Sequence, residues 1–282
     1  STKIGLYEDG QQKFETNLTH SAEEIAKYES VMHQGDMRRD AIVNFLSENG
    51  VELDSIDLIM ARGGLITPIQ TGVYEVTEEM REALIEGKNG AHACNLSALI
   101  ADDMAADINK MRAEKGIEGV CKAYIADAPT SDDMLPELKI SGHPAFARRP
   151  AFHTLNSRAM VRRYARNAGK DVRNLTVIVA HMGGGSSVSL HRNGLVIDVN
   201  DALGGDGPMS PERAGSVPAF PLVEMCFSGQ YTKAEIKKKL VGKGGAVAYF
   251  GTNDIREVIA RAKDGDEACA TFLKGFCVSV AK

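Results

Sequence analysis

The chain has 282 residues, of which 43% are hydrophobic, and it carries 33 Lys and Arg against 38 Asp and Glu. This length and composition can bury a sizeable core and predict two lobes, whereas a formal charge of -5 offers no electrostatic footprint for a nucleic-acid backbone. No apolar run approaches the roughly 20 residues that span a bilayer and no signal segment opens the chain, so we expect a cytoplasmic protein without nucleic-acid or membrane partners.

The first predicted element is a strand over residues 3–8, which ends at the turn Asp9-Gly10. A helix is expected to begin at Ser21, because Ser21 can cap it and Glu24 follows three residues later, as in a capping box. The helical pattern then runs with breaks towards residue 50.

Two short apolar strands are predicted at residues 56–61 and 121–126, with helices at residues 77–86 and around residues 96–108 between them. The first strand ends at Arg62, followed by Gly63-Gly64, and the second ends at Asp127. In α/β sheets the carboxyl ends of strands carry the chemistry, so Arg62 and Asp127 become candidates for a site.

The most informative segment is residues 175–218, where a glycine-rich loop joins two strands. Residues 175–180 form an uninterrupted apolar and β-branched run, which predicts a strand buried on both faces. Three glycines, Gly183 to Gly185, follow it at once. Residues 187–191 and 195–199 then read as two strands joined by the hairpin turn Asn193-Gly194.

Glycines permit positive φ, so the backbone N–H groups of such a loop can point into one concavity and hold an anion. His181 and Ser186 flank the loop, although three glycines can also make a tight turn without a ligand. The opening of the chain repeats the pattern in miniature, since residues 1–10 resemble residues 186–194. We therefore expect two related lobes, each a β-meander followed by helices, with a nucleotide between them.

Helices are predicted at residues 253–263 and from residue 266 onward. Two prolines lie in residues 142–150, which places a lobe boundary there, before a helix around residues 156–169. The predicted lobes are therefore residues 1–150 and 151–282, the first truncated at its start and the second at its end.

Residues 181–215 closely resemble the butyrate kinase branch of the acetokinase family, and so do residues 61–69, 92–101, 125–134 and 250–258, in the right order. The resemblance implies an α/β fold of two ribonuclease-H-like lobes, with mixed β-sheets flanked by helices and an interlobe nucleotide cleft. Family members also carry a strand-loop before the first residue of this chain and an adenosine motif after its last. We therefore expect a fragment that neither binds ATP in full nor turns over alone.

The reaction implied by the resemblance converts ATP and a short-chain carboxylate, such as butyrate or a branched relative, into ADP and an acyl phosphate, and also runs in reverse. The implied cofactors are ATP or ADP and Mg²⁺, and the implied assembly is a homo-oligomer. Phosphoryl transfer requires positioning and charge neutralisation more than covalent help, and the guanidinium fork of arginine suits that task.

The resemblance also implies roles for individual residues, each of which has a structural alternative as a salt bridge, core histidine, helix cap or glycine turn. Acetate kinases place their substrate arginine a few residues before the paired glycines, whereas Arg62 directly precedes Gly63-Gly64. Asp127 is the expected Mg²⁺ ligand. The expected catalytic residues are Arg62, His92, Asp127, His181 and Arg213. The expected nucleotide-binding residues are His181, Gly183, Gly184, Gly185, Ser186, Asn200, Asp201, Gly204, Gly205, Asp254 and Arg256.

Two other classes of protein compete with this interpretation. A dinucleotide-binding dehydrogenase needs G-x-G-x-x-G between a strand and a helix, and the hairpin expected after Gly185 argues against it. An ATP-gated, nonenzymatic binding module of the chaperone or actin type would share the hairpin lobes. Such a module would not need Arg62, His92 and Arg213 to converge on a small acid.

Overall fold

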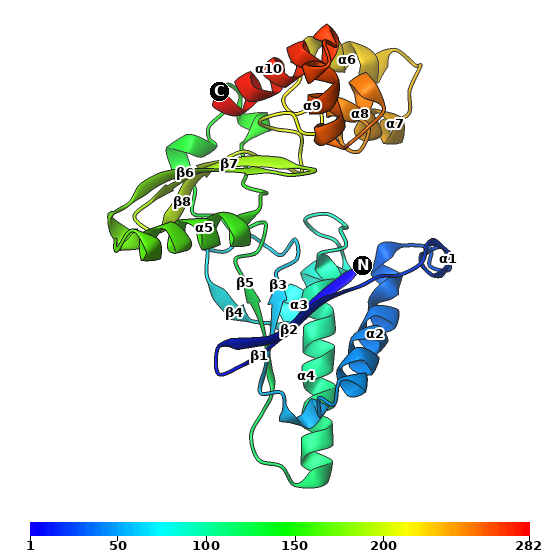
Figure 1. Ribbon diagram of the computed structural model, residues 1–282, viewed down its shortest axis with the longest axis vertical. Helices are drawn as coiled ribbons and strands as arrows, with labels where there is room; N and C mark the ends of the chain where they lie inside the picture. Colours follow the sequence, from blue (N-terminus) through cyan, green and yellow to red (C-terminus); the bar gives the residue numbers. More distant parts are fainter. The chain divides into compact units, whose positions relative to one another are not determined.

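The computed structural model describes residues 1–282, which form two compact units (Figure 1). Unit 1 comprises residues 1–68 and 72–128, and unit 2 comprises residues 69–71 and 129–282. Residues 129–150 belong to unit 2, where Phe152 N donates to Pro129 O (3.0 Å) and Leu135 N donates to Ile197 O (3.2 Å). A lobe boundary at residue 150 stays a prediction.

Unit 1 opens with an antiparallel hairpin of strands β1 (Thr2–Glu8) and β2 (Gln11–Leu18). Asp9 and Gly10 connect them with φ of 50° and 76°, the left-handed pair that a two-residue type I′ turn requires. The predicted strand and turn are therefore confirmed. The pairing register shifts between Leu6 and Tyr7, which marks a β-bulge.

The helix predicted at Ser21 begins there, because Ser21 Oγ accepts a hydrogen bond from Glu24 N (3.0 Å). Helix α1 (Ala22–Ile25) is only one turn long, and a break precedes the 3₁₀ turn η1 (Val31–Gln34) and helix α2 (Gly35–Glu48). The expectation of a helical pattern with breaks is confirmed. A second 3₁₀ turn, η2 (Leu53–Ser55), leads from α2 to the next strand.

A three-stranded mixed sheet forms the centre of unit 1. Its strands are β3 (Leu58–Arg62), β4 (Val73–Glu75) and β5 (Lys122–Ala126), in the order β3-β5-β4, with β3 parallel and β4 antiparallel to β5. Helices α3 (Glu78–Ile85) and α4 (Asn95–Lys115) lie between β4 and β5 in the chain. The expected core face of α4 is confirmed, and its buried apolar side chains include Leu96, Leu99, Ile100, Ala101, Met104 and Ile108.

Unit 2 contains helix α5 (Thr154–Asn167) and the antiparallel strands β6 (Thr176–Met182), β7 (Ser186–Arg192) and β8 (Leu195–Val199), in that order across the sheet. Asn193 and Gly194 form the predicted hairpin turn, with φ of 55° and 85°. The 3₁₀ turns of this unit are η3 (Pro136–Lys139), η4 (Pro144–Phe146) and η5 (Val172–Asn174). Its remaining helices are α6 (Ala219–Phe227), α7 (Lys233–Leu240), α8 (Gly245–Phe250), α9 (Ile255–Lys263) and α10 (Glu267–Ala281).

The prediction that residues 175–180 form a strand buried on both faces is wrong. Strand β6 lies at the edge of its sheet, its residues alternate between exposed and partly buried, and Ile178 is 69% exposed. The central strand β7 is the buried one, although it carries Ser186, Ser187, Ser189 and His191. The order of strands, which the apolar run does not encode, decides which of them is covered.

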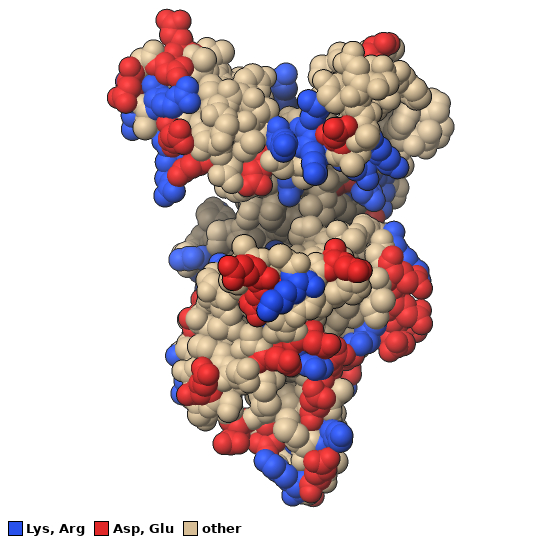
Figure 2. Space-filling view, turned by 90° about the vertical axis from the view of Figure 1, so that its right-hand side faces the viewer, with Lys and Arg blue, Asp and Glu red and all other residues tan.

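The two units differ in charge. Most of the acidic residues lie in unit 1, whereas most of the Lys and Arg lie in unit 2. Acidic and basic side chains are interspersed on the face that Figure 2 shows. A net positive unit 2 favours an anionic ligand there.

No helix combines the length and the apolar character that crossing a bilayer requires.

His191 on β7 makes the stability of unit 2 dependent on pH. Its ring is 2% exposed and contacts Ser189 Oγ through Nε2 (2.9 Å), and burial, assisted by Arg158, lowers its pKa from 6.5 to about 4. Between these values the unfolded chain binds more protons than the folded chain, so stability falls as pH falls. We expect the free energy of unfolding to drop by about 1 to 2 kcal/mol from pH 6.5 to 5.

Urea unfolding followed by circular dichroism at pH 7, 6 and 5 measures this slope. The variant His191→Gln lacks the titrating ring, so its unfolding free energy should vary less over the same interval whatever its absolute stability. Equal slopes for the two proteins would exclude His191 as the cause.

Candidate active site

The glycine loop of unit 2 connects β6 directly to β7, as predicted. Gly183 N donates to Gly185 O (3.1 Å), and the strand pairing continues on both sides of the loop, up to Met182 opposite Ser186. A strand, and not a helix, follows the glycines. The topology that a dinucleotide-binding fingerprint requires is therefore absent at this loop.

Arg213 lies against the glycine loop. A Cβ atom at Gly185 would stand 2.7 Å from the guanidinium carbon of Arg213, so a larger residue there would displace the end of this side chain. Arg213 Nη1 donates to Ala202 O, and Ser210 Oγ donates to Gly184 O. Burial lowers the pKa of Arg213, which Glu212 and Asp201 oppose, and an arginine keeps its charge at neutral pH. The structure thus brings a partly buried cation to the glycine loop.

Ser186, at the beginning of β7, carries a buried hydroxyl without a hydrogen-bond partner. The residue is 3% exposed. A buried hydroxyl left unpaired costs about 1 to 3 kcal/mol, and this one lies directly after the three glycines. Its position beside a loop of backbone donors points to a ligand that would complete its hydrogen bonding.

His181, at the end of β6, belongs to a pair of stacked imidazoles. Its ring lies 3.7 Å from that of His153, centroid to centroid, with an interplanar angle of 6°. His181 Nδ1 contacts Asn156 Nδ2 (2.9 Å), and His153 Nδ1 contacts Ser187 Oγ (3.0 Å). The sequence did not single out His153. Its only signal there is its place three residues before the helix predicted around residues 156–169, and no periodicity links it to His181.

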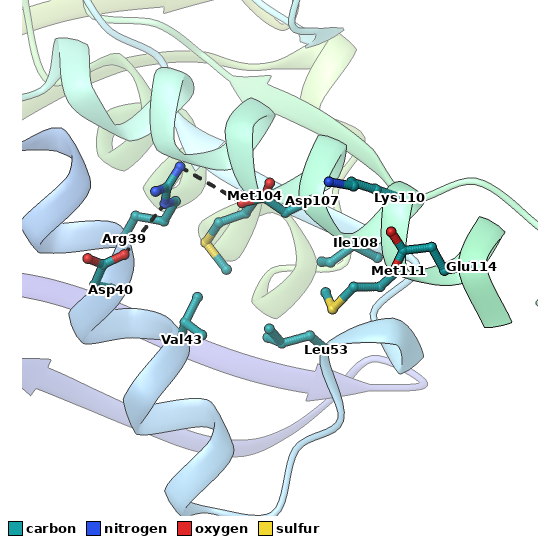
Figure 3. A pocket seen from close by; sticks show the side chains of 10 residues that line it. All are labelled: Arg39, Asp40, Val43, Leu53, Met104, Asp107, Ile108, Lys110, Met111 and Glu114. Atoms are coloured by element: carbon teal, nitrogen blue, oxygen red, sulfur yellow. Dashed lines mark ion pairs between the residues drawn. The ribbon is translucent and has the colours of Figure 1, made fainter.

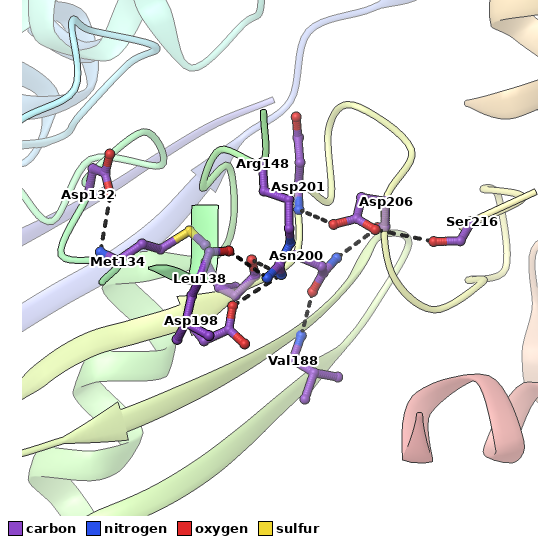
Figure 4. Close-up of polar contacts among 11 residues, drawn as sticks. Asp132, Met134, Leu138, Arg148, Val188, Asp198, Asn200, Asp201, Asp206 and Ser216 are labelled. Carbon is purple, nitrogen blue, oxygen red and sulfur yellow. Dashed lines mark hydrogen bonds and ion pairs between the residues drawn. The ribbon is translucent and has the colours of Figure 1, made fainter. Parts of the chain in front are cut away.

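Asn200 and Asp201 hold the loop that follows β8 (Figure 4). Asn200 Oδ1 accepts from Val188 N (2.8 Å), and its Nδ2 donates to Asp206 O (2.9 Å). Asp201 accepts from Leu203 N (3.0 Å) through Oδ1. These bonds lie within the protein, so nucleotide contacts by either side chain stay a prediction.

Glycine is required at two places in the same loop, and an open cavity adjoins it. A Cβ atom at Gly204 would overlap the carboxylate of Asp201, and one at Gly207 would overlap the amide of Asn200. A role for Gly204 and Gly205 in nucleotide binding stays a prediction.

The cavity beside this loop has a volume of about 300 Å³, and its lining residues are Phe146, Ala147, Arg148, Arg149, Asp201, Gly204 and Asp206.

Arg62 and Asp127 lie at the same edge of the unit 1 sheet. Arg62 ends β3 opposite Ala126, the last residue of the parallel strand β5, and Asp127 follows directly. Asp127 is 4% exposed and adopts a left-handed backbone with φ of 45°, a conformation that is uncommon outside glycine and often marks a functional position. The carboxyl ends of the parallel strands β3 and β5 therefore bring these two predicted site residues together, as expected.

His92 lies next to the same edge, three residues before α4 begins at Asn95. Its Nδ1 is 3.0 Å from Cys94 Sγ, and the hydroxyl of Ser97 on α4 donates to Arg62 O. Burial raises the pKa of the Cys94 thiol, and Arg62 partly opposes that effect. Arg62 and the beginning of α4 are thus neighbours, so the three predicted residues of unit 1 come from one region of the sheet edge.

Gly63 and Gly64 serve close packing. A Cβ atom at Gly63 would lie 2.6 Å from Ala128 Cβ, and one at Gly64 would overlap the Leu84 side chain. Asn95, which is fully buried, accepts from Leu65 N (3.0 Å) and so fixes the loop from the other side. The pair of glycines therefore holds the end of β3, where Arg62 lies, in one conformation.

Asp254 and Arg256 interact with each other at the beginning of α9. Asp254 caps the helix by accepting from Arg256 N (2.9 Å), and its carboxylate pairs with Arg256 Nη2 (2.7 Å). This hydrogen bond lowers the pKa of Asp254 to about 2. The alternative of a helix cap with a surface charge describes this geometry, and a contact with adenosine stays a prediction.

Comparison with known proteins agrees with the resemblance. A model of the acetokinase family matches residues 141–282. The whole chain is 44% identical to butyrate kinase 1 of Clostridium acetobutylicum and 42% identical to a probable butyrate kinase of Clostridium botulinum strain Alaska E43, and it spans 76% of each.

Solved structures show the same fold. The acetate kinase of Entamoeba histolytica has a TM-score of 0.71 at 17% identity over 99% of this chain and 68% of that one. The acetate kinase of Porphyromonas gingivalis has a TM-score of 0.67 at 19% identity over 89% of this chain and 63% of that one. The predicted α/β fold with mixed sheets flanked by helices is therefore confirmed.

Proposed function

This chain belongs to the acetokinase family, and from that premise we propose that it transfers a phosphoryl group between ATP and a short-chain carboxylate, butyrate or a branched relative. The products are ADP and an acyl phosphate, and the reverse reaction makes ATP. The main structural observation that supports this reaction type is the glycine loop, beside which lie the positive charge of Arg213 and the unpaired hydroxyl of Ser186. Chain-wide identity to butyrate kinases supports the substrate class.

The chemistry needs no general base, because a carboxylate is already ionised at neutral pH. Its oxygen attacks the γ-phosphorus in line, and the bond from that phosphorus to the leaving oxygen of ADP breaks. Charge spreads over three equatorial oxygens in a loose transition state, so the protein must position the reactants and neutralise charge.

Unit 2 supplies the nucleotide side of this reaction in our proposal. The backbone N–H groups of Gly184 and Gly185 and the hydroxyl of Ser186 bind phosphate oxygens, whereas the N–H group of Gly183 already donates to Gly185 O. Arg213 neutralises the charge that develops on the transferring group. His181, held by its stack on His153, donates a hydrogen bond to the same group.

Unit 1 supplies the groups that hold the carboxylate and the metal. Arg62 binds the acid through its guanidinium fork, and His92 beside it donates a hydrogen bond to the reacting groups. The carboxylate of Asp127 suits Mg²⁺, which binds one or two protein carboxylates together with phosphate oxygens. Mg²⁺ would supply neutralisation of the phosphates there.

We also propose that the protein works in the cytoplasm as a homo-oligomer. Light scattering after size-exclusion chromatography tests the oligomeric state.

Trapping the acyl phosphate with hydroxylamine tests the proposal. As in every activity and binding experiment below, the chain is extended at both ends to include the strand-loop and the adenosine motif expected of the family. It is incubated with ATP, Mg²⁺ and butyrate, and the hydroxamate is measured as its ferric complex. We expect hydroxamate only when all three are present, and a higher kcat/KM for butyrate than for acetate by about tenfold or more, since each methylene adds about 1 to 3 kcal/mol.

Calorimetric titration with ATP completes this test. Binding of ATP without hydroxamate from any acid would favour the nonenzymatic module, and absence of both would contradict the proposed function for this chain.

A further inference from the structure

The hairpin of unit 1 repeats the hairpin that follows the glycine loop in unit 2. Each hairpin begins with a residue that carries a hydroxyl group. In both, the strand pairing shifts register the same number of residues after that residue, and a turn of two left-handed residues follows, also at the same spacing. Thr2 therefore occupies in unit 1 the place that Ser186 occupies in unit 2. The matching positions are Thr2 and Ser186, Leu6/Tyr7 and Leu190/His191, and Asp9-Gly10 and Asn193-Gly194.

The two hydroxyls differ in how they are held. Ser186 Oγ has no partner, whereas Thr2 Oγ1 accepts from Arg38 Nη1 (2.9 Å) and contacts His20 Nε2 (2.8 Å). Arg38 Nη1 also donates to Ser1 O (3.0 Å). Arg38 and His20, which lie outside the two strands of the hairpin, thus fix both the backbone and the side chain at the beginning of β1.

These two residues are themselves held in place. The His20 side chain is 3% exposed, with Glu24 Oε2 at 3.6 Å from its Nδ1. Arg38, on α2, donates through Nη2 to Oε1 of the buried Gln34 (2.7 Å), and its Nε is buried without a partner. Burial and Arg38 lower the pKa of His20, while Glu24 opposes them. Arg38 is therefore the charged member of the pair at neutral pH.

We propose that Arg38 and His20 are positioning residues for the phosphoryl transfer proposed above. They hold Ser1 and Thr2 in the conformation in which the opening of β1 meets a phosphate of the nucleotide, as the opening of β7 does in unit 2. Neither side chain touches substrate in this arrangement, because both are spent on Ser1, Thr2 and Gln34. This inference rests on the proposed function.

The test compares Arg38→Gln with Arg39→Gln. The neighbouring residue Arg39 is a matched control, because it borders a cavity between α2 and α4 and makes only long ion pairs, of 3.6 to 3.8 Å (Figure 3). Loss of charge-assisted hydrogen bonds predicts that Arg38→Gln raises the Kd and KM for ATP about tenfold or more. The KM for butyrate should stay within about twofold, and Arg39→Gln should leave all three constants within that range.

A second pair of variants keeps the test decisive if Arg38→Gln unfolds. Thr2→Val removes the hydroxyl, whereas Thr2→Ser retains it. Thr2→Val should therefore weaken ATP binding, and Thr2→Ser should bind ATP as the unaltered chain does. Hydrogen exchange at the amides of residues 3–6 should accelerate in Arg38→Gln.

The outcomes separate this inference from the function on which it rests. If the unaltered chain binds ATP and forms hydroxamate while Arg38→Gln and Thr2→Val behave like Arg39→Gln, the positioning role is wrong and the proposed function stands. If the unaltered chain does neither, the proposed function itself fails.

Discussion

Replacing Arg213 by glutamine should lower the rate of acyl phosphate formation by about a thousandfold, because the charge beside Gly185 would no longer stabilise the transferring phosphoryl group. Glutamine is uncharged and shorter than arginine, so the loop loses the positive charge together with the hydrogen bond from Nη1 to Ala202 O. We therefore expect the loss mainly in kcat, measured by hydroxamate formation, with a smaller change in the Kd for ATP.

Arg173→Gln is the control for this prediction. Arg173 is also an arginine of unit 2, but its side chain is 82% exposed and pairs with Asp171, the residue that caps η5. Its replacement should change kcat by less than about twofold. A rate for Arg213→Gln within tenfold of the original would show that this guanidinium has a structural role alone.

Replacing Gly245 by alanine should destabilise unit 2 by about 3 kcal/mol or more. Gly245 begins α8 with φ of 55°, and a Cβ atom there would overlap Ser210 O and lie 2.9 Å from Arg213 O. The loop from Ser210 to Arg213 would have to move, so activity should fall together with stability. Urea unfolding followed by circular dichroism measures the first effect and hydroxamate formation the second.

Gly275 provides the matched control for Gly245. It lies inside α10 without a left-handed φ, and a Cβ atom there would have nothing within 4 Å. Gly275→Ala should therefore stabilise the chain by about 0.5 to 1 kcal/mol, because alanine favours the helix. Similar effects of the two substitutions would show that the loop adapts to a side chain at position 245.

Local signals account for the elements that the sequence predicted. Asp9-Gly10 and Asn193-Gly194 can adopt the left-handed pair of a hairpin turn, and Ser21 caps its helix through Glu24 N, so these elements depend on few neighbours. The burial of β6 was predicted wrongly, because it depends on which strands lie beside it. An apolar side chain such as Ile178 can be largely exposed, while the central strand buries several polar residues.

The candidate site was predictable where strand ends define it. Arg62 and Asp127 end neighbouring parallel strands, which the sequence can indicate from two short apolar runs. His153 was missed because its stack on His181 joins residues far apart in the chain. The pairing of Arg256 with Asp254, and the packing of Gly63 against Ala128, likewise depend on geometry that residue types alone do not specify.

The matched bulges and turns of the two hairpins limit how these segments can change. A single inserted residue between Thr2 and Asp9, or between Ser186 and Asn193, would rotate every later side chain of that strand to the opposite side of the ladder. Substitutions preserve the alternation and deletions or insertions destroy it. The length of each hairpin should therefore be nearly invariant among relatives, while the chemistry of its first residues remains free to diversify.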